Sequence, residues 1–408
     1  MERALGDAAQ PGVDGRRYTC LAAGKAAPAM AVAAATWSGA AIRAGLVVGA
    51  DLGRSWAEQI PPPFETVVSG HPLPTAASED AGRRALALAD SVRPGETLLV
   101  LVSGGASALL AVPADGVTLD DKRLTTNQLL RAGADIYALN TVRKHLSAIK
   151  GGWLAARTKG WCRTLVISDV VGDDLSVIAS GPTVADASTF DDALDVLNRF
   201  GGPAAFPAAV VERLRRGAAG AIDDTPSPGD PRLARTTTTV IGSRRDAMVG
   251  GAEEAARRGY RVVRIDDAVT GEARSMALPH FQRAMAQAGS GSRPVCIISS
   301  GETTVHVTGS GKGGRNQEFA LAAAPLLATA GAPVALASAG TDGVDGPTDA
   351  AGAIVDRTTL ARASAAGLRP DQFLLDNNAY AFFHALGDLI HTGPTGTNVG
   401  DLQVILLA

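Results

Sequence analysis

Short apolar runs that end in glycine-containing turns and alternate with alanine-rich stretches constrain the fold of this chain most strongly. Runs of this kind, rich in Val, Leu and Ile and bounded by turn residues, predict buried strands. The first series of runs is 18–23, 46–49, 66–69, 97–102 and 164–168. Alanine-rich stretches such as 25–37 and 78–91 lie between them and predict helices. The alternation predicts a Rossmann-like parallel sheet covered by helices, which is an α/β fold.

A second series of apolar runs predicts a second α/β domain. Its members are 237–241, 260–265, 294–299, 333–337 and 403–407. Residues 217–235 separate the two series and are rich in Gly, Asp and Pro, a composition that does not hold a core element. We therefore expect one domain over residues 1–225 and another over 226–408.

Composition argues against several classes of protein. The 38 Lys and Arg residues nearly balance the 41 Asp and Glu residues, so charge gives no reason to expect a nucleic-acid or anionic-membrane partner. Aromatic residues make up 4% of the chain, too few for a platform that stacks nucleic-acid bases. The three cysteines are far apart, which argues against a disulfide scaffold or a cysteine zinc site. The first residues lack the apolar segment of a signal peptide, so a cytoplasmic protein is expected.

Polar residues gather in the turns that follow the predicted strands. In open parallel sheets, ligands bind beyond the carboxyl ends of the strands. The turns carry Lys25, His71, Ser103, Asp169, Glu302 and Asp342. Gly and Ser are common in any strand-to-helix turn, but the geometry of such a turn does not account for the carboxylates and the lysine. The pattern predicts a polar cleft between the two domains.

The turn at 103–107 is a candidate anion site. It follows a buried run and opens a helical stretch, and its sequence is Ser103-Gly104-Gly105-Ala106-Ser107. A glycine pair there lets backbone N–H groups face an anion, and the serines add hydroxyl donors. A tight turn also needs glycine, so a structural role is the alternative. Leu109 stands where a G-x-S-x-G nucleophile motif needs its last glycine.

The glycine-rich segment 309–315 allows three interpretations. Its sequence matches G-x-G-x-x-G and precedes a helical stretch, as in a dinucleotide-binding fingerprint. The preceding residues alternate polar and apolar, however, and no acidic residue lies near position 334 to bind a ribose hydroxyl. Glycines with two cations, Lys312 and Arg315, suit a phosphate chain better. A purely structural turn is the third interpretation.

Carboxylates supply candidate ligands for a metal or a general base. The acidic set is Asp169, Asp173, Asp174, Glu302, Asp342, Asp345 and Asp349. Mg²⁺ prefers oxygen ligands and is often held by one or two carboxylates together with substrate phosphates. Helix N-capping is the alternative role of Asp. Asp169 and Asp342 each follow a predicted strand and are the stronger candidates.

Several basic residues are also ambiguous. Lys25 follows a buried run and Gly24, where it can meet a carboxylate or a phosphate or can simply be solvated. Residues 140–152 predict a basic helix, either a solvated face or the lining of the anion site. His71 has a bracing role or a catalytic one.

The motifs together resemble those of the glycerate 2-kinases. The segments that carry the resemblance are 24–27, 70–72, 103–109, 140–152, 168–170, 178–183, 311–318 and 341–346. Residues 392–399 resemble the end of the family's C-terminal domain, the MOFRL domain, so the second domain is expected to hold a mixed sheet. The resemblance covers about residues 20–408. Members usually carry a longer helical segment before the Gly-Lys turn, whereas residues 7–17 here predict a loop.

The resemblance implies transfer of the ATP γ-phosphate to the 2-hydroxyl of D-glycerate, with Mg²⁺, to give 2-phosphoglycerate and ADP. It assigns essential positive charge to Lys25 and Arg315, and metal binding or base catalysis to Asp169 and Asp342. The expected substrate-binding residues are His71, Ser103, Gly104, Gly105, Ser107 and Asn398. The expected phosphate-binding residues are Gly311, Lys312, Gly313, Gly314 and Glu302. Two alternatives are an NAD(P)H-dependent hydroxypyruvate reductase, a name often given to members, and a non-catalytic sugar-acid-binding protein. A monomer or a homodimer is expected.

Overall fold

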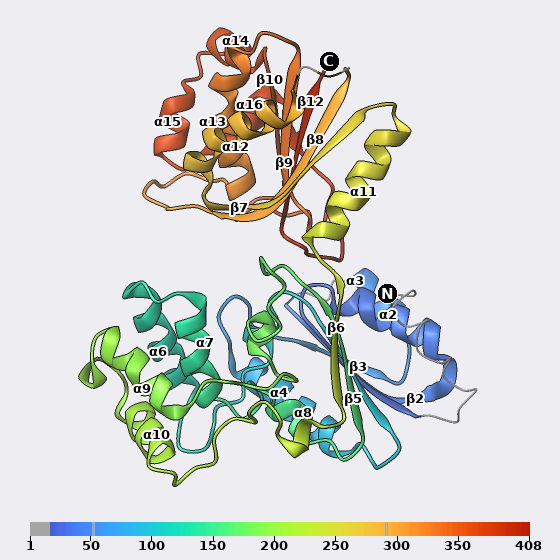
Figure 1. Cartoon of the computed structure of the whole chain (residues 1–408), viewed down its shortest axis with the longest axis vertical. Helices are drawn as coiled ribbons and strands as arrows, with labels where there is room; N and C mark the ends of the chain where they lie inside the picture. The colour runs from blue at the N-terminus through green and yellow to red at the C-terminus, as the bar shows by residue number, and fades with distance from the viewer. Residues whose placement is uncertain (1–16, 51–53, 290, 292) are drawn as a thin grey trace. The chain divides into compact units, whose positions relative to one another are not determined.

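The computed structural model describes residues 17–50, 54–289, 291 and 293–408 and divides into two compact units (Figure 1). The N-terminal unit holds the described residues up to Ser168 together with Asp173–Ile241. The C-terminal unit holds Asp169–Gly172 and Gly242–Ala408. The predicted loop at 7–17 lies almost wholly outside the described residues. No helix within the described parts of the chain has the length and apolar character needed to cross a membrane.

The division between the units differs from the sequence prediction. The run at 237–241 becomes β6 (Thr236–Gly242), which we expected in the second sheet but which is an edge strand of the first. The glycine- and proline-rich segment 217–235 therefore lies inside the N-terminal unit and is not a linker between the units. The sequence of a strand does not specify which strand it pairs with. The composition of residues 217–235 therefore did not locate the boundary between the two units.

The N-terminal sheet has the strand order β3-β2-β1-β4-β5-β6. Its other strands are β1 (Tyr18–Ala23), β2 (Ile42–Gly49), β3 (Phe64–Val68), β4 (Thr97–Val102) and β5 (Trp161–Ile167). The pairs β1/β2, β1/β4, β2/β3 and β4/β5 are all parallel. This is the strand order of Rossmann-type sheets, in which the order reverses between β1 and β4, so a ligand site is expected at the carboxyl ends of those two strands.

Helices cover both faces of this sheet, which explains why every residue of β1 and β4 is buried. Figure 1 shows α2 (Ala27–Ser38) on one face and α4 (Ala76–Asp90) on the other. Cys20 and Leu99 point to the α2 face and pack with Met30. The short helices of this layer are α3 (Arg54–Gln59), α5 (Ala106–Leu109) and α8 (Trp153–Ala156). The predicted Rossmann-like domain is confirmed.

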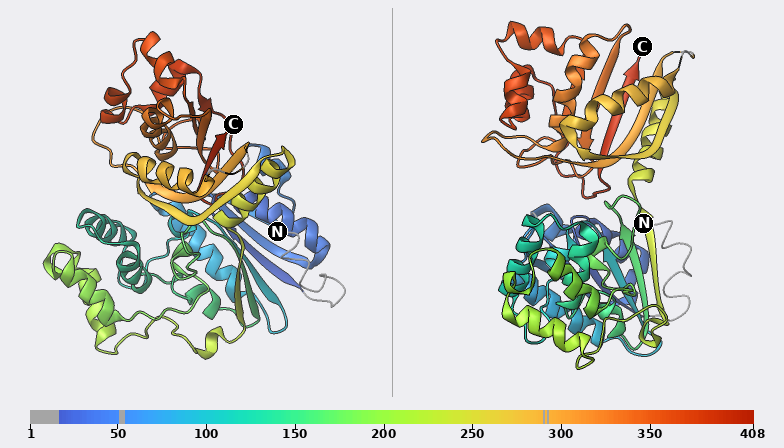
Figure 2. Two further views of the ribbon diagram at one scale, coloured as in Figure 1. Left: turned by 45° about the horizontal axis from the view of Figure 1, so that its top comes forward. Right: turned by 60° about the vertical axis from the view of Figure 1, so that its left-hand side comes forward.

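A separate helical layer forms beside the sheet, visible in both views of Figure 2. It consists of α6 (Leu119–Arg131), α7 (Ile136–His145), α9 (Phe190–Arg199) and α10 (Ala208–Ala218), packed around Phe190 and Leu214. The predicted basic helix at 140–152 corresponds to α7 only as far as His145. The residues that follow are not helical, and Gly151 and Gly152, both with positive φ, form a turn. Four short 3₁₀ helices complete the described elements of the N-terminal unit: η1 (Gly39–Ala41), η2 (Ile178–Ser180), η3 (Pro203–Ala205) and η4 (Pro231–Leu233).

The C-terminal sheet is mixed, with the order β11-β10-β9-β12-β8-β7. Its strands are β7 (Arg261–Glu272), β8 (Val295–Thr304), β9 (Val334–Gly340), β10 (Gly352–Asp356), β11 (Leu389–Ile390) and β12 (Asp401–Leu407). β7 and β8 are parallel, and the other neighbours are antiparallel. Sequence analysis missed β10 and β11 because both are short. The expected two-domain α/β fold with a mixed second sheet is confirmed.

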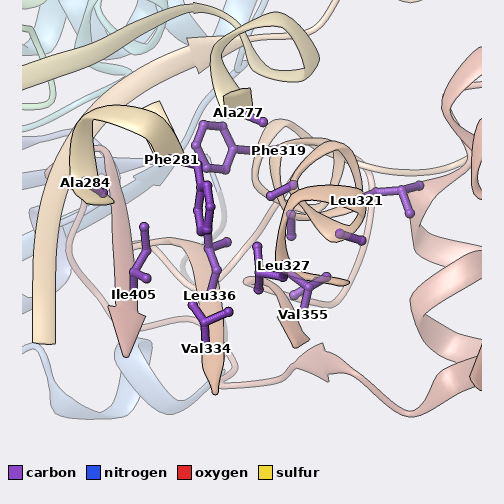
Figure 3. Packing of buried hydrophobic residues seen from close by; sticks show 14 of the residues in the cluster. Ala277, Phe281, Ala284, Phe319, Leu321, Leu327, Val334, Leu336, Val355 and Ile405 are labelled. Carbon is purple, nitrogen blue, oxygen red and sulfur yellow. The ribbon is translucent and has the colours of Figure 1, made fainter. Parts of the chain in front are cut away.

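The core of the C-terminal unit follows the alternation of side chains along each strand. Ile405 and Leu336 face α12 (Ala273–Ala288) and α13 (Arg315–Ala328), where they pack around Phe281 and Phe319 (Figure 3). Residues of the opposite parity, such as Ile298, face α11 (Arg244–Arg257). The remaining helices are α14 (Thr359–Ala365), α15 (Pro370–Leu375) and α16 (Ala379–Leu386).

Candidate active site

The turns after β1 and β4 are joined directly, at the point where the strand order reverses. The amide of Ser103 donates to the carbonyl of Ala23 over 3.0 Å, and the amide of Lys25 donates to the carbonyl of Gly104 over 2.9 Å. The Ser103 hydroxyl accepts the amide of Ala26 at 2.9 Å. The structure thus brings together Lys25 and the 103–107 turn, two of the predicted anion-binding elements. Ser103 acts there as a structural acceptor.

Glycine is required at position 24 for this junction. Gly24 has a φ of 125°, and a Cβ at that position would lie 2.2 Å from Ser103 Oγ and 2.5 Å from its carbonyl oxygen. An L side chain is disfavoured at such a φ and has no space there. The Gly-Lys sequence therefore reflects close approach of the two turns.

His71 lies against the same turn. A Cβ at Gly105 would lie 3.0 Å from the His71 Cδ2 atom, so the imidazole ring packs over the glycine. Burial and the nearby charge of Lys25 lower the pKa of His71 below its usual value. The ring is therefore neutral at pH 7, which allows it to donate one hydrogen bond and accept another.

Ser107 belongs to a hydrogen-bond chain that fixes the direction of its hydroxyl proton. The Lys150 ammonium donates to Ser107 Oγ over 2.9 Å and to the Ser107 carbonyl over 2.7 Å. The Ser180 hydroxyl donates to Asn140 Oδ1 over 2.9 Å. A hydroxyl has one proton, so Ser107, 2.9 Å from Ser180 Oγ, must donate to it. The expected role of the Ser107 hydroxyl as a donor to a bound anion is therefore not supported by this geometry.

In the C-terminal unit, Arg315 is held by two carboxylates. Its Nε lies 2.9 and 2.8 Å from the two oxygens of Asp401, and its Nη1 lies 2.7 Å from Glu302. Burial disfavours the charged guanidinium, but these carboxylates outweigh that effect and raise its pKa further. Arg315 thus keeps a fixed positive charge at the first turn of α13.

Asp345 holds the N-terminus of α13. Its carboxylate accepts the amides of Asn316 and Gln317 over 3.1 and 2.9 Å. The side chain is buried, and burial raises its pKa to about 6 although the two amides favour the ionised form. A Cβ at Gly314 would lie 2.2 Å from the Asp345 Cγ, so a glycine is required there for the contact.

The glycine-rich loop 309–314 is packed against residues 376–379. The amides of Gly309 and Lys312 donate to the side chains of Asn377 and Asn378 over 2.9 and 3.1 Å. A Cβ at Gly311 would lie 2.3 Å from the Asn378 Cβ. The structural interpretation therefore accounts for these glycines. Phosphate binding by the Lys312 and Arg315 side chains stays a prediction, as does the part assigned to the loop backbone.

Asp169 and Asp342 lie against one loop of the C-terminal unit. The Asn398 amide donates to Asp169 Oδ2 over 2.8 Å, and the Asp342 carbonyl accepts the amide of Thr395 over 3.1 Å. The described residues hold no group of three or more acidic, histidine or cysteine side chains suited to a metal ion. Mg²⁺ can be bound by one or two carboxylates when phosphate oxygens complete its shell, so this donor set fits that ion.

Sequence reasoning missed Asp401 and Ser180, and it included Lys150 only as one residue of the basic segment 140–152. Asp401 is fully buried and accepts from Arg315, Asn316 and the Thr303 amide, although it lies 86 residues from Arg315 in the chain. The one available signal was an aspartate at the start of a mostly apolar strand. A pocket of about 500 Å³ elsewhere in the N-terminal unit, lined by residues such as Arg83, Asp115 and Arg157, includes none of the predicted site residues.

The two units together define a class of protein: a two-domain α/β protein with a cationic site at a Rossmann switch point and an acid-rich site in a mixed-sheet domain. Residues 2–215 match the family described as domain of unknown function DUF4147, and residues 295–401 match the MOFRL family. The chain is 41% identical over 396 residues to a D-glycerate 2-kinase of Thermotoga maritima, which covers 96% of this chain and 91% of the relative. The chain belongs to the glycerate 2-kinase family.

Solved structures and other relatives agree with the family assignment. A crystal structure of glycerate kinase from Thermotoga maritima matches with a TM-score of 0.87 at 39% identity, covering 100% of this chain and 95% of that one. A relative from Agrobacterium vitis, 39% identical over 96% of this chain and 87% of its own length, bears a provisional hydroxypyruvate reductase name. The family assignment and the two-domain fold were both predicted from the sequence and are confirmed.

Proposed function

We propose that this protein is a glycerate 2-kinase that uses ATP and Mg²⁺. The observation that carries the proposal is the match to a D-glycerate 2-kinase over nearly the whole chain, both domains included. The 2-hydroxyl oxygen of D-glycerate forms a bond to the γ-phosphorus, and the bond from that phosphorus to the bridging oxygen of ADP breaks. The hydroxyl proton passes to a carboxylate, and the products are 2-phosphoglycerate and ADP.

In this proposal the N-terminal set binds the hydroxy acid or the transferred phosphoryl group. Lys25 supplies positive charge at the β1 turn. The 103–107 turn contributes backbone groups, since the hydroxyls of both Ser103 and Ser107 have structural partners. Neutral His71 can hydrogen-bond the substrate without adding charge.

The C-terminal set serves the phosphates. Phosphoryl transfer depends mostly on positioning and on electrostatic stabilisation of the phosphate oxygens, which is the role we assign to Arg315 and Lys312. Asp169 and Asp342 are the candidates for holding Mg²⁺ and for accepting the hydroxyl proton. Mg²⁺, when bound, neutralises charge on the phosphates.

The reductase alternative finds less support in the residues. A dinucleotide fingerprint belongs at the first strand-to-helix turn of a Rossmann domain, and that turn contains the single Gly24. In the formal match at 309–314, amides of the loop donate to Asp376, Asn377 and Asn378. The loop is thus tied to its own chain.

A paired assay tests the proposed function. One portion of protein receives ATP, Mg²⁺ and D-glycerate, and ADP release is measured. The other receives NADH or NADPH and hydroxypyruvate, and loss of nicotinamide absorbance is measured. We expect glycerate-dependent ADP release and no reduction of hydroxypyruvate. Reduction without ADP release would establish the reductase, and binding of glycerate with neither reaction would indicate a sugar-acid-binding protein.

A further inference from the structure

Three consecutive basic residues on α7 differ in their partners. Lys144 forms an ion pair with buried Asp186 at 3.1 Å, and His145 Nε2 lies 2.8 Å from Asp224. Across residues 17–50, 54–289, 291 and 293–408, the structure records no hydrogen bond or ion pair for the guanidinium of Arg143. Arg143 is nevertheless half-buried. A half-buried guanidinium without an anion is costly, which makes this residue unusual on its helix.

Arg143 faces the same region as the 103–107 turn. Asn140 lies three residues earlier on α7, so the two side chains share a helix face. Asn140 accepts from Ser180, which in turn lies 2.9 Å from Ser107. The ammonium of Lys150 donates to Ser107, and the positive charge of Arg143 is one of the causes that lower the pKa of Lys150. These contacts place Arg143 beside the polar network under the turn.

The surroundings of Arg143 are strongly cationic. Buried Lys150 donates to neutral oxygens of Ser107 and Leu110, and buried Lys122 donates to the carbonyl of Val112. Burial, together with neighbouring cations that include Arg143, lowers the pKa of Lys122 to about 7 and that of Lys150 well below its usual value. A bound anion would relieve this repulsion.

We propose that Arg143 binds the carboxylate of the hydroxy-acid substrate. The assignment rests on the proposed function and extends it to one residue. From the sequence, the segment 140–152 that contains Arg143 was interpreted only as a solvated helix face or as part of the lining of the anion site. A guanidinium matches a carboxylate with two parallel hydrogen bonds. In the C-terminal unit, by contrast, Glu302 and Asp401 pair with Arg315. Asp169 and Asp342 suit metal-bound phosphates. We therefore assign the carboxylate of the hydroxy acid, which needs no metal ion, to Arg143.

Binding without nucleotide tests this assignment directly. We expect D-glycerate to raise the Tm of the wild-type protein, and Arg143→Ala to abolish most of that shift. Arg123→Ala is the matched control, because Arg123 lies on the neighbouring helix α6 and pairs with exposed Asp120. The control keeps the wild-type shift. Arg143→Ala leaves the Tm of the unliganded protein unchanged or higher, since no partner within the described chain is lost; if it fails to fold, Arg143→Gln replaces it in the same assay.

Steady-state kinetics separate the carboxylate from other anions. Arg143→Ala raises the KM for D-glycerate by roughly 10- to 100-fold, as expected for loss of a charge-assisted hydrogen bond, and leaves the KM for ATP unchanged. Arg143→Lys recovers only part of the affinity, and added guanidinium ion partly rescues Arg143→Ala. A rise in the KM for ATP alone would assign Arg143 to the nucleotide and overturn the proposal.

The outcomes also distinguish this proposal from the proposed function. Arg143-dependent binding of D-glycerate in a protein that releases no ADP would keep the carboxylate site and reject the kinase. Full kinase activity with an unchanged KM for D-glycerate in Arg143→Ala would keep the kinase and reject the site. A wild-type protein that neither binds nor phosphorylates D-glycerate would reject both.

Discussion

At the scale of single residues, the candidate site depends on charged groups whose partners are far away in the sequence. Lys25 and the 103–107 turn could be predicted to meet, because the carboxyl ends of parallel strands lie at one edge of a sheet. The partners of Asp401 and Lys150 could not be predicted, because they lie 86 and 43 residues away in the chain. Local sequence patterns give no information about such pairings.

Replacement of Arg315 with Ala removes the fixed positive charge at α13. We expect kcat to fall on the order of 10²–10³-fold, the loss typical of one transition-state donor. The Tm also falls, because buried Asp401 loses its cation. Kinetics at a temperature well below the Tm separate the two effects, and Arg315→Lys is the conservative comparison. Turnover close to that of wild type would exclude Arg315 from the reaction.

Replacement of Gly24 with Ala tests the junction of the β1 and β4 turns. The added methyl group overlaps Ser103, so we expect a lower Tm and a large loss of glycerate-dependent activity. Gly95→Ala is the control, since Gly95 also has a positive φ, but a Cβ there would meet no atom of the described residues within 4 Å. If the two variants lost the same stability, backbone strain alone would explain the effect.

The buried carboxyl of Asp345 makes stability depend on pH in a defined window. Its pKa is about 6 in the folded protein and about 3.9 in an unfolded chain, so the folded state binds more protons between these values. This contribution to stability therefore falls as the pH rises from about 4 to 6 and is level above that. We expect the Tm of wild type relative to Asp345→Asn to fall over this window. A constant difference would contradict the account.

At the scale of elements, the strands were predicted well and their neighbours were not. The runs at 18–23 and 97–102 coincide with β1 and β4, because both strands are buried along their whole length and consist mostly of apolar residues. β10 was missed, since its apolar run is only three residues long. β6 was predicted as a strand but assigned to the wrong sheet. Pairing depends on the partner surface, which an isolated segment does not reveal.

Asn377 tests the element that supports the glycine-rich loop. Its side chain accepts the amides of Thr308 and Gly309, donates to Glu318, and its backbone has a φ of 52°. We expect Asn377→Ala to lower the Tm, because several buried groups lose partners. Asn377→Gly lowers it less, since glycine tolerates this φ. Equal losses in both variants would mean that backbone conformation makes no contribution there.

At the scale of the whole molecule, the units divide after β6 rather than at residue 225. A fragment of residues 1–225 lacks β6 and exposes the backbone edge of β5, which favours aggregation. We expect residues 1–241 to give more soluble protein with a sharper thermal transition than residues 1–225. Light scattering and circular dichroism measure both. Equal behaviour of the two fragments would show that β6 contributes little to the N-terminal sheet.

The family and the two-domain fold follow from motifs spread over nearly the whole chain, which is why they could be recognised before the structure. Site assignments are different, because a motif gives residue types but not their partners. Ser107 shows the distinction: its position in the turn was correct, yet its hydroxyl proton serves Ser180. The oligomeric state and the polar cleft between the domains stay predictions.

The most direct test of the central claim is the position of the transferred phosphate. The protein is incubated with ATP, Mg²⁺ and D-glycerate, and the product is then given to enolase without phosphoglycerate mutase. We predict direct conversion, because 2-phosphoglycerate is the substrate of enolase. Conversion only after addition of the mutase would show that the 3-hydroxyl is phosphorylated and would contradict the account.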